Sequence, residues 1–174
     1  MSKIELIHGS CADQKADAVV NAANQHLLGG SGICGVIFSM AGDKDLAMAC
    51  CKYDTPLNDG DAVITPSFNM KNFKAIIHAV GPDFRHGGKP EDLFKAYYNS
   101  LVTLMNNGYH SISFPLISSG IFAGNSKDPV GESVKNCIGA YKKFTENYPD
   151  YDIEVLVCAY SPDEYTRAER IIHE

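Results

Sequence analysis

The sequence lacks a long apolar run, a pair of cysteines at C-x-x-C spacing and an excess of basic residues. A membrane-spanning helix needs about 20 consecutive apolar residues, so none is expected, and the charged N-terminal segment does not resemble a signal peptide. Without a C-x-x-C pair, the six cysteines show no structural zinc site. We therefore expect a soluble protein of a reducing, cytoplasmic compartment, with no metal and no cofactor.

Acidic residues outnumber basic ones, with 21 Asp and Glu against 15 Lys and Arg and a formal net charge of −6. Duplex nucleic acid is bound mainly through lysine and arginine, so nucleic acid is not an expected partner. A small anionic ligand is compatible with this charge, because backbone N–H groups at helix N-termini bind phosphate without a cationic side chain.

The chain has the size and composition of one domain. Its 174 residues are 45% apolar, which suffices for one substantial core. No internal repeat or linker divides the sequence. We expect a single domain over residues 1–174 and, because no heptad pattern is present, a monomer.

The apolar pattern predicts an α/β fold. Segments with helical spacing occur at residues 36–51, 93–105, 130–144 and 163–172. Gly42 is expected to break the first of them, with Asp43 capping the second piece. Short apolar segments typical of buried strands alternate with these helices, which predicts a three-layer α/β/α sandwich. The predicted strands are residues 4–7, 18–20, 62–65, 75–79, 112–114 and 155–158.

Two glycine-rich loops follow predicted strands, where α/β sheets bind ligands. Residues 21–35 have the sequence NAANQHLLGGSGICG and lead into a helix, and residues 118–124 have the sequence SSGIFAG. Glycines let the backbone approach a ligand, and a helix start offers free N–H groups and a favourable dipole to an anion. The first loop matches neither the Walker A motif nor G-x-G-x-x-G.

Together the two loops could hold the two phosphates of a nucleotide diphosphate. The alternative for the first loop is a plain connection between strand and helix. Phe122 could form an apolar wall against a sugar or base, or it could be an ordinary core aromatic residue.

Four motifs in order resemble the macro domain family. They are residues 18–24 (AVVNAAN), 29–32 (GGSG), 77–82 (IHAVGP) and 115–122 (PLISSGIF), and the resemblance runs from about residue 4 to residue 172. It implies a mixed, mostly parallel sheet of six or seven strands between helices, with an ADP-ribose cleft at its crest. It also implies ADP-ribose or a mono-ADP-ribosylated protein as partner, and in many members hydrolysis of mono-ADP-ribose from carboxylate side chains or of related esters.

The resemblance also assigns roles to residues. Asn24 would hydrogen-bond the distal ribose, Phe122 would flank that ribose, and Tyr160 would stack on adenine. The catalytic candidates are Asn24, Cys34 and Phe122. The ligand-binding candidates are Ser10, Cys11, Asn24, Gly29, Gly30, Ser31, Gly32, Ile33, Cys34, Ser118, Ser119, Gly120, Ile121, Phe122 and Tyr160.

Three polar residues near these motifs are expected to be structural or solvated instead. Asn21 opens the motif that contains Asn24, and its side chain is expected to bond nearby backbone. His78 is expected to be structural at a strand end, and His26 to be a solvated loop residue, so neither is a catalytic candidate.

Two positions depart from the family pattern. Many macro domains have Gly-Asp after the first strand, where this chain has a serine, Ser10, which can accept the adenine hydrogen bond only without charge assistance. Asp13 could replace the missing aspartate if its loop bends suitably. Cys34 stands where the hydrolase branch has an aspartate in Gly-Val-Asp-Gly, which removes the obvious general base.

Two roles for Cys34 therefore stay open. It could line the loop passively, which we favour, or the helix start could lower its pKa enough to give a reactive thiolate. Macro domains of some positive-strand RNA viruses also have Gly-Val-Cys here and include hydrolases. In such a mechanism, loop backbone positions a water that attacks the anomeric carbon, and a ligand phosphate oxygen assists.

Three functions fit the sequence. The leading hypothesis is an ADP-ribosyl hydrolase acting on modified protein carboxylates or related esters. The alternatives are a non-catalytic reader of ADP-ribose, favoured by the missing aspartate, and an O-acetyl-ADP-ribose deacetylase acting on a small metabolite.

Overall fold

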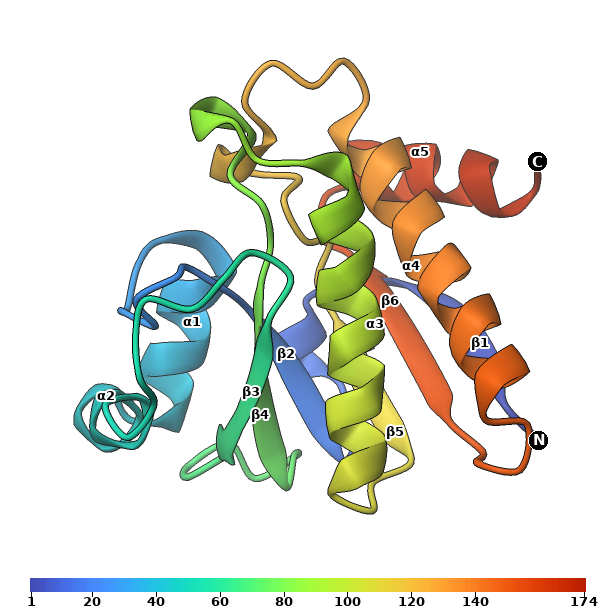
Figure 1. The fold of residues 1–174 in the computed structure, drawn as a ribbon. Helices are drawn as coiled ribbons and strands as arrows, with labels where there is room; N and C mark the ends of the chain where they lie inside the picture. Colours follow the sequence, from blue (N-terminus) through green and yellow to red (C-terminus); the bar gives the residue numbers. More distant parts are fainter.

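The computed structural model describes residues 1–174, which form one six-stranded sheet between helices (Figure 1). The strands are β1 (Lys3–His8), β2 (Ala18–Ala23), β3 (Ala62–Pro66), β4 (Ala75–Val80), β5 (Ser111–Phe114) and β6 (Glu154–Ala159). The helices are α1 (Gly32–Ala41), α2 (Asp43–Cys50), α3 (Pro90–Asn106), α4 (Pro129–Asn147) and α5 (Pro162–Ile172).

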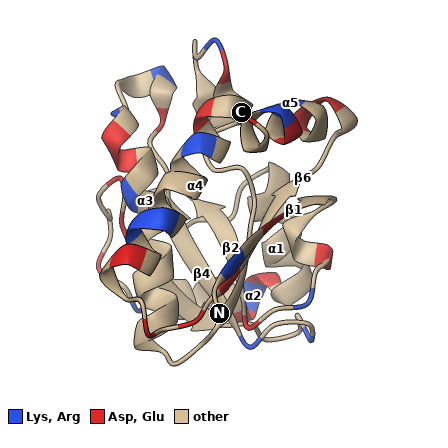
Figure 2. Ribbon diagram, turned by 90° about the vertical axis from the view of Figure 1, so that its right-hand side faces the viewer, with Lys and Arg blue, Asp and Glu red and all other residues tan.

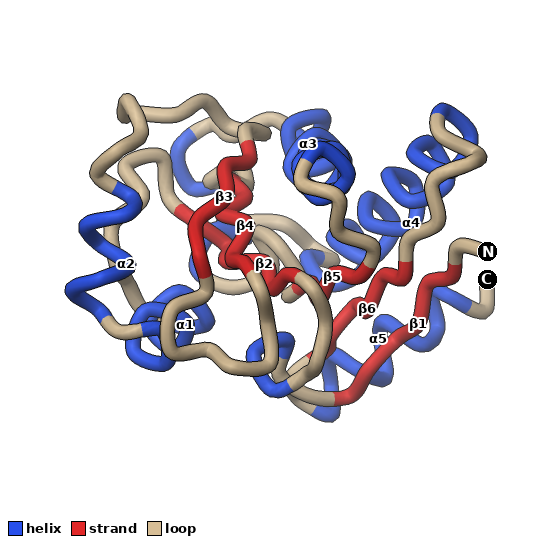
Figure 3. Tube along the Cα trace, turned by 90° about the horizontal axis from the view of Figure 1, so that it is seen from below, coloured by secondary structure: helices blue, strands red, loops and turns tan.

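The sheet is mixed but mostly parallel, in the order β1-β6-β5-β2-β4-β3. Only β3 runs antiparallel, paired with β4 at one edge. Helices α3 and α4 lie on one side of the sheet and α1 and α2 on the other (Figure 3), while α5 packs against α4, β1 and β6. The predicted three-layer α/β/α sandwich is confirmed.

Two apolar clusters, one on each face, hold the layers together. In β2, Ala18 and Val20 belong to the cluster under α3 and α4, whereas Val19 belongs to the cluster under α1 and α2. Side chains of a strand alternate between faces, so a strand covered on both sides is apolar at most positions. This burial explains why β2 and β4 are apolar except at Asn21 and His78.

All six predicted strands are present, but β2 continues three residues beyond the predicted end, through Ala23. Helix α1 begins at Gly32, four residues earlier than predicted. The predicted break at Gly42 is confirmed, because this glycine has φ 112° between the two helices. The predicted capping by Asp43 is wrong: Gly42 is the N-cap residue of α2, Asp43 lies in the first turn, and no side chain caps the helix.

Charged residues of both signs stand beside one another on α3, α4 and α5 (Figure 2). No helix carries a continuous basic stripe of the kind that binds a phosphate backbone. No helix combines the length and apolar character needed to cross a bilayer.

Candidate ligand-binding cleft

A cleft of about 850 Å³ lies at the carboxyl ends of the parallel strands. Its wall is built from the segments that follow β1, β2, β4, β5 and β6, together with the start of α1. This is the edge of an α/β sheet at which ligands bind, and the volume is in the range of small-molecule sites.

Every ligand-binding candidate from the sequence lines this cleft except Gly29. Gly29 packs instead on the aromatic ring of Phe38 in α1. Sequence reasoning missed several lining residues that neighbour the motifs or come from other elements. They are Gly9, Ala22, Val36, Arg85, Pro115, Leu116, Cys158 and Glu164, with Asp13 considered only as a substitute for the missing aspartate.

The first loop is organised by Asn24. Its Oδ1 accepts hydrogen bonds from the backbone N–H groups of His26 and Leu28, both at 3.1 Å, and its Nδ2 donates to the Leu28 carbonyl at 2.9 Å. An asparagine that bonds backbone two and four residues ahead fixes a turn. Asn24 therefore lines the cleft and also shapes the loop that leads to α1.

The loop then folds back tightly onto the first turn of α1. A side chain at Gly35 would bring its Cβ within 2.6 Å of the Gly30 carbonyl oxygen, so only glycine allows this approach. Ser31 is the N-cap residue but makes no side-chain cap hydrogen bond. The first N–H groups of a helix have no intrahelical acceptor, so the start of α1 offers donors to an anion in the cleft.

Cys34 lies in that first turn and is 6% exposed. Its Sγ donates to the Leu28 carbonyl at 3.6 Å. Burial raises the pKa of the Cys34 thiol, although hydrogen bonds from the Asn21 side chain and the Gly30 backbone oppose the shift. A thiolate base requires a lowered pKa, so the raised pKa of Cys34 favours the passive role over the reactive one.

Asn21 and His78 form a buried pair beneath the first loop. They stand opposite each other in the parallel register of β2 and β4, and Asn21 Nδ2 donates to His78 Nδ1 at 3.1 Å. His78 Nε2 lies 3.0 Å from the Thr65 hydroxyl, and burial lowers the pKa of His78 to about 4.

His78 is thus neutral at physiological pH and closed off from the cleft, as a structural histidine would be. The expectation that Asn21 bonds nearby backbone is wrong, because its partner is the imidazole of the neighbouring strand. His26 is exposed and does not line the cleft.

The second loop is anchored at its base by buried hydroxyl groups. The Ile117 N–H donates to the Tyr97 hydroxyl at 2.9 Å, and the Ser133 hydroxyl donates to the Ile117 carbonyl at 2.6 Å. Tyr97 in turn donates to Ser133, and both side chains are completely buried. The next residue, Ser118, has φ 59° and donates its hydroxyl to the Pro82 carbonyl at 2.8 Å.

The other end of the cleft is formed by the segments that follow β1 and β6. The Ser10 hydroxyl accepts from the Ala12 N–H at 3.2 Å, as the cap of a short 3-10 turn, Cys11–Asp13. That turn carries Asp13 to the cleft wall. Cys11 is buried and Tyr160 is 73% exposed, and both contribute to the wall.

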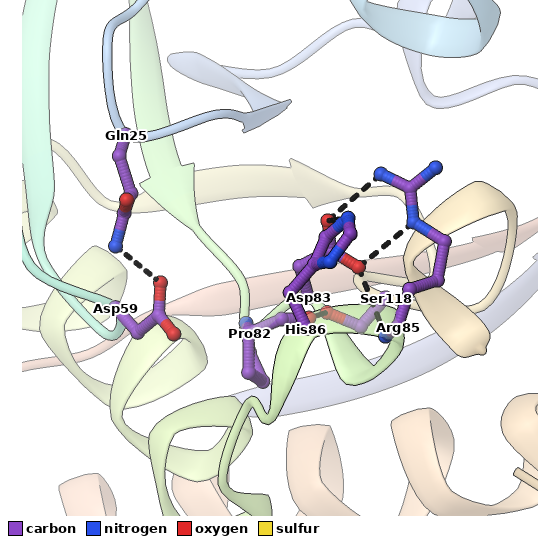
Figure 4. A network of polar contacts seen from close by, with 7 residues as sticks. All are labelled: Gln25, Asp59, Pro82, Asp83, Arg85, His86 and Ser118. Carbon is purple, nitrogen blue, oxygen red and sulfur yellow. Dashed lines mark hydrogen bonds and ion pairs between the residues drawn. The ribbon is translucent and has the colours of Figure 1, made fainter. Parts of the chain in front are cut away.

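Arg85 is the only Lys or Arg that lines the cleft. It comes from the short turn after β4, where Asp83 accepts hydrogen bonds from its Nε at 3.0 Å and its Nη2 at 2.8 Å (Figure 4). Its guanidinium carbon lies 5.5 Å from the centre of the Phe122 ring. The turn after β4 and the second loop thus meet at the cleft through a cation and an aromatic ring.

No group of three or more His, Cys, Asp and Glu side chains is arranged to hold a metal ion. The cleft wall offers backbone N–H groups, the Asn24 amide, the Arg85 guanidinium and the Phe122 ring. Backbone N–H groups at a helix start suit a phosphate.

Comparison with known proteins supports the same reading of the fold. A sequence model of the Macro domain matches residues 20–130. An uncharacterized protein of Fusobacterium nucleatum is 41% identical over 84% of this chain and 81% of its own length. A protein of Citrobacter rodentium named O-acetyl-ADP-ribose deacetylase is 39% identical over 80% of each chain.

Solved structures agree. The Oceanobacillus iheyensis macrodomain with ADP is 28% identical and has a TM-score of 0.87, covering 99% of this chain and 90% of that chain. The Trypanosoma brucei macrodomain in complex with ADP-ribose is 29% identical and has a TM-score of 0.84, covering 97% of this chain and 68% of that chain. On the match to the family sequence model and on these relatives, the chain belongs to the macro domain family.

Proposed function

We propose that the protein binds ADP-ribose in this cleft and hydrolyses esters that join a carboxylate to the distal ribose. The observation that carries the proposal is the pairing of two anchored loops across one cleft of about 850 Å³, with the start of α1 at one of them. Relatives named O-acetyl-ADP-ribose deacetylase and macrodomain structures with ADP or ADP-ribose support this ligand and this chemistry.

The proposed binding mode follows from the geometry of the loops. The start of α1 and residues 118–122 would hold the diphosphate with backbone N–H groups. Asn24 and Phe122 would position the distal ribose, and Ser10, Asp13 and Tyr160 would surround the adenine. A carboxylate such as Asp13 can accept a charge-assisted hydrogen bond that the Ser10 hydroxyl cannot.

The catalysis we propose depends on position rather than on a strong base. Neither His78 nor Cys34 is suited to take a proton from water near neutral pH. His78 is buried with a pKa of about 4, so it is a weak base, and the raised pKa of Cys34 keeps its sulfur protonated. Loop backbone would hold a water against the anomeric carbon. The water oxygen bonds to that carbon, the bond to the carboxylate breaks with its electron pair on the carboxylate, and a ligand phosphate oxygen takes the proton.

Two substrates are esters of this kind. One is a protein with mono-ADP-ribose on a carboxylate side chain, which reacts by the attack at the anomeric carbon, and the other is O-acetyl-ADP-ribose. In both, hydrolysis leaves a free carboxylate and a sugar hydroxyl group. For the acetyl ester, water instead adds to the acyl carbon, and the acyl C–O bond breaks with its electron pair on the ribose oxygen. That oxygen takes one proton of the water, and the acetic acid releases the other to solvent.

A non-catalytic reader is the second candidate function. The observation that favours it is the absence of any Asp, Glu or exposed His beside Cys34 in the first turn of α1. A reader would use the same two loops to hold the ligand and would release it unchanged.

The decisive experiment is calorimetric titration with ADP-ribose, followed in the same preparation by two release assays. One assay measures acetate from O-acetyl-ADP-ribose, and the other measures label from a protein mono-ADP-ribosylated on carboxylates. Binding with release in either assay supports the hydrolase. Binding without release would replace it by the reader, and no binding would refute both.

A further inference from the structure

We propose that Arg85, held by Asp83 against the Phe122 ring, forms the subsite for the acyl group of the substrate and stabilises the negative charge that develops on that group as the ester breaks. This inference rests on the proposed function and names a substrate-binding residue that the motifs do not contain. Arg85 comes from the connection between β4 and α3, outside both glycine-rich loops.

The guanidinium is held in one orientation. Asp83 accepts the Nε–H and one Nη2–H of Arg85, and it also accepts the Arg85 backbone N–H at 3.1 Å. His86 Nε2 lies 4.0 Å from the same carboxylate. A guanidinium has five N–H donors, so three are left after the bidentate pair forms. Figure 4 shows this pair next to Pro82 in the chain, and the Pro82 carbonyl accepts the hydroxyl of Ser118 at the start of the second loop.

The backbone at Arg85 is packed closely against the end of the second loop. A Cβ at Gly124 would approach the Arg85 nitrogen to 2.9 Å, so the turn after β4 and the end of the second loop leave no room for a side chain there. The short turns Phe84–His86 and Ile121–Ala123 are in direct contact. Arg85 and Phe122 thus come from two short turns that pack against each other, and a ribose held by Phe122 would have the cation beside it.

Arg85 supplies the only positively charged Lys or Arg side chain in the cleft wall. The other charged residues of the cleft wall, Asp13 and Glu164, are acidic, and Asp13 stands at the Ser10 end. In both proposed reactions, an oxygen of the acyl group gains negative charge as the ester breaks. A fixed guanidinium at that oxygen stabilises the transition state more than the neutral ester, which raises kcat.

The arrangement also separates this role from phosphate binding. In the proposed binding mode, the start of α1 and the backbone of residues 118–122 supply the donors for the two phosphates. The Arg85 guanidinium instead stacks on the Phe122 ring, which flanks the ribose in the proposed binding mode. Loss of Arg85 should therefore affect turnover of the ester more than affinity for ADP-ribose.

The test compares Arg85→Ala, Arg85→Lys and Asp83→Asn with a matched control, Arg170→Ala. Arg170 is an exposed arginine in the last turn of α5, and it does not line the cleft. For each variant, kcat is measured by acetate release from O-acetyl-ADP-ribose, and Kd for ADP-ribose is measured by calorimetry. Guanidinium ion is then added at low, non-denaturing concentration.

We expect Arg85→Ala to lower kcat by about tenfold or more while Kd for ADP-ribose changes less than about threefold. Arg85→Lys should recover only part of the rate, because an ammonium group cannot form the bidentate pair with Asp83. Guanidinium should restore part of the rate of Arg85→Ala and leave Arg170→Ala unchanged. Asp83→Asn should lie between the wild type and Arg85→Ala.

Three results would overturn the inference. Arg85→Ala with the kcat of Arg170→Ala would show that Arg85 does not act on the ester. A rise in Kd as large as the fall in kcat would make Arg85 a phosphate contact instead. A wild type that binds ADP-ribose without releasing acetate or label would refute the proposed hydrolase and this subsite with it. If the wild type is active and Arg85→Ala has the same kcat, only the subsite is refuted.

Discussion

The hydroxyl group of Tyr97 should be necessary for the stability of the second loop. It accepts the Ile117 N–H at 2.9 Å and donates to Ser133, which in turn holds the Ile117 carbonyl. In Tyr97→Phe, the Ile117 N–H is left buried without an acceptor, and Ser133 loses its donor. An unpaired buried polar group costs about 1–3 kcal/mol of unfolding free energy.

For a chain of this size, about 1 kcal/mol shifts Tm by roughly 2–4 °C, so Tyr97→Phe should unfold roughly 2–12 °C below the wild type. Because the loss lies one residue before Ser118, affinity for ADP-ribose should fall in the same variant. Calorimetric unfolding and ligand titration of one preparation measure both effects.

The matched control is Tyr98→Phe. The Tyr98 hydroxyl also accepts a hydrogen bond, from Asn147 at 2.7 Å, but this contact is exposed to water. Water replaces a lost exposed partner, so the unfolding free energy of this variant should change by less than about 0.5 kcal/mol. If Tyr97→Phe and Tyr98→Phe have equal Tm and equal affinity, the buried hydroxyl pair does not anchor the loop and the reasoning is refuted.

Three further predictions concern the first loop and the residues beneath it. Cys34→Ala should keep the rate of acetate release within about twofold of the wild type, because the thiol is buried and its pKa is raised. Loss of turnover with intact ADP-ribose binding would instead reveal a reactive thiolate. Asn24→Ala should lower kcat on the order of 10- to 100-fold, since it removes three loop hydrogen bonds and the proposed ribose contact, and it should weaken ADP-ribose binding less. An unchanged kcat would contradict the assignment. His78, with its pKa lowered to about 4 in the folded state and about 6.5 when unfolded, stabilises the fold fully above pH 6.5. This contribution to the unfolding free energy, up to roughly 3 kcal/mol, should be lost as pH falls towards 4. In urea unfolding at pH 7 and pH 5, the unfolding free energy of His78→Gln should therefore change less with pH than that of the wild type.

Cys34 and His78 show how burial decides which groups can act as acids or bases. Both are residue types used in catalysis, and both lie near the first loop. Burial raises the pKa of the thiol and lowers the pKa of the imidazole, so each group is held in its neutral form. The chemistry proposed for the cleft therefore depends on the ligand phosphate and on fixed hydrogen-bond donors.

Local pattern was enough to predict most of the framework. Strands β2, β4 and β6 are largely apolar segments that the sheet buries, whereas the exposed edge strand β1 still has apolar residues at Ile4, Leu6 and Ile7. Helices α3, α4 and α5 each begin at a proline, which suits the first turn of a helix. The end of β2 was predicted three residues early, because Asn21 is polar. Its amide is tolerated in the sheet only because His78 stands opposite it on β4.

By itself, the sequence determined the α/β class, the order of strands and helices, the two glycine-rich loops and all but one of the residues expected at the cleft, since these depend on neighbouring residues along the chain. Only the tertiary structure decided that Gly29 packs on Phe38, that Asn21 bonds His78, that Asp13 reaches the cleft and that Arg85 lies over Phe122. These contacts join segments that are distant in the chain. They follow from strand register and from the packing of loops, and the pKa values follow from burial, which no local pattern encodes.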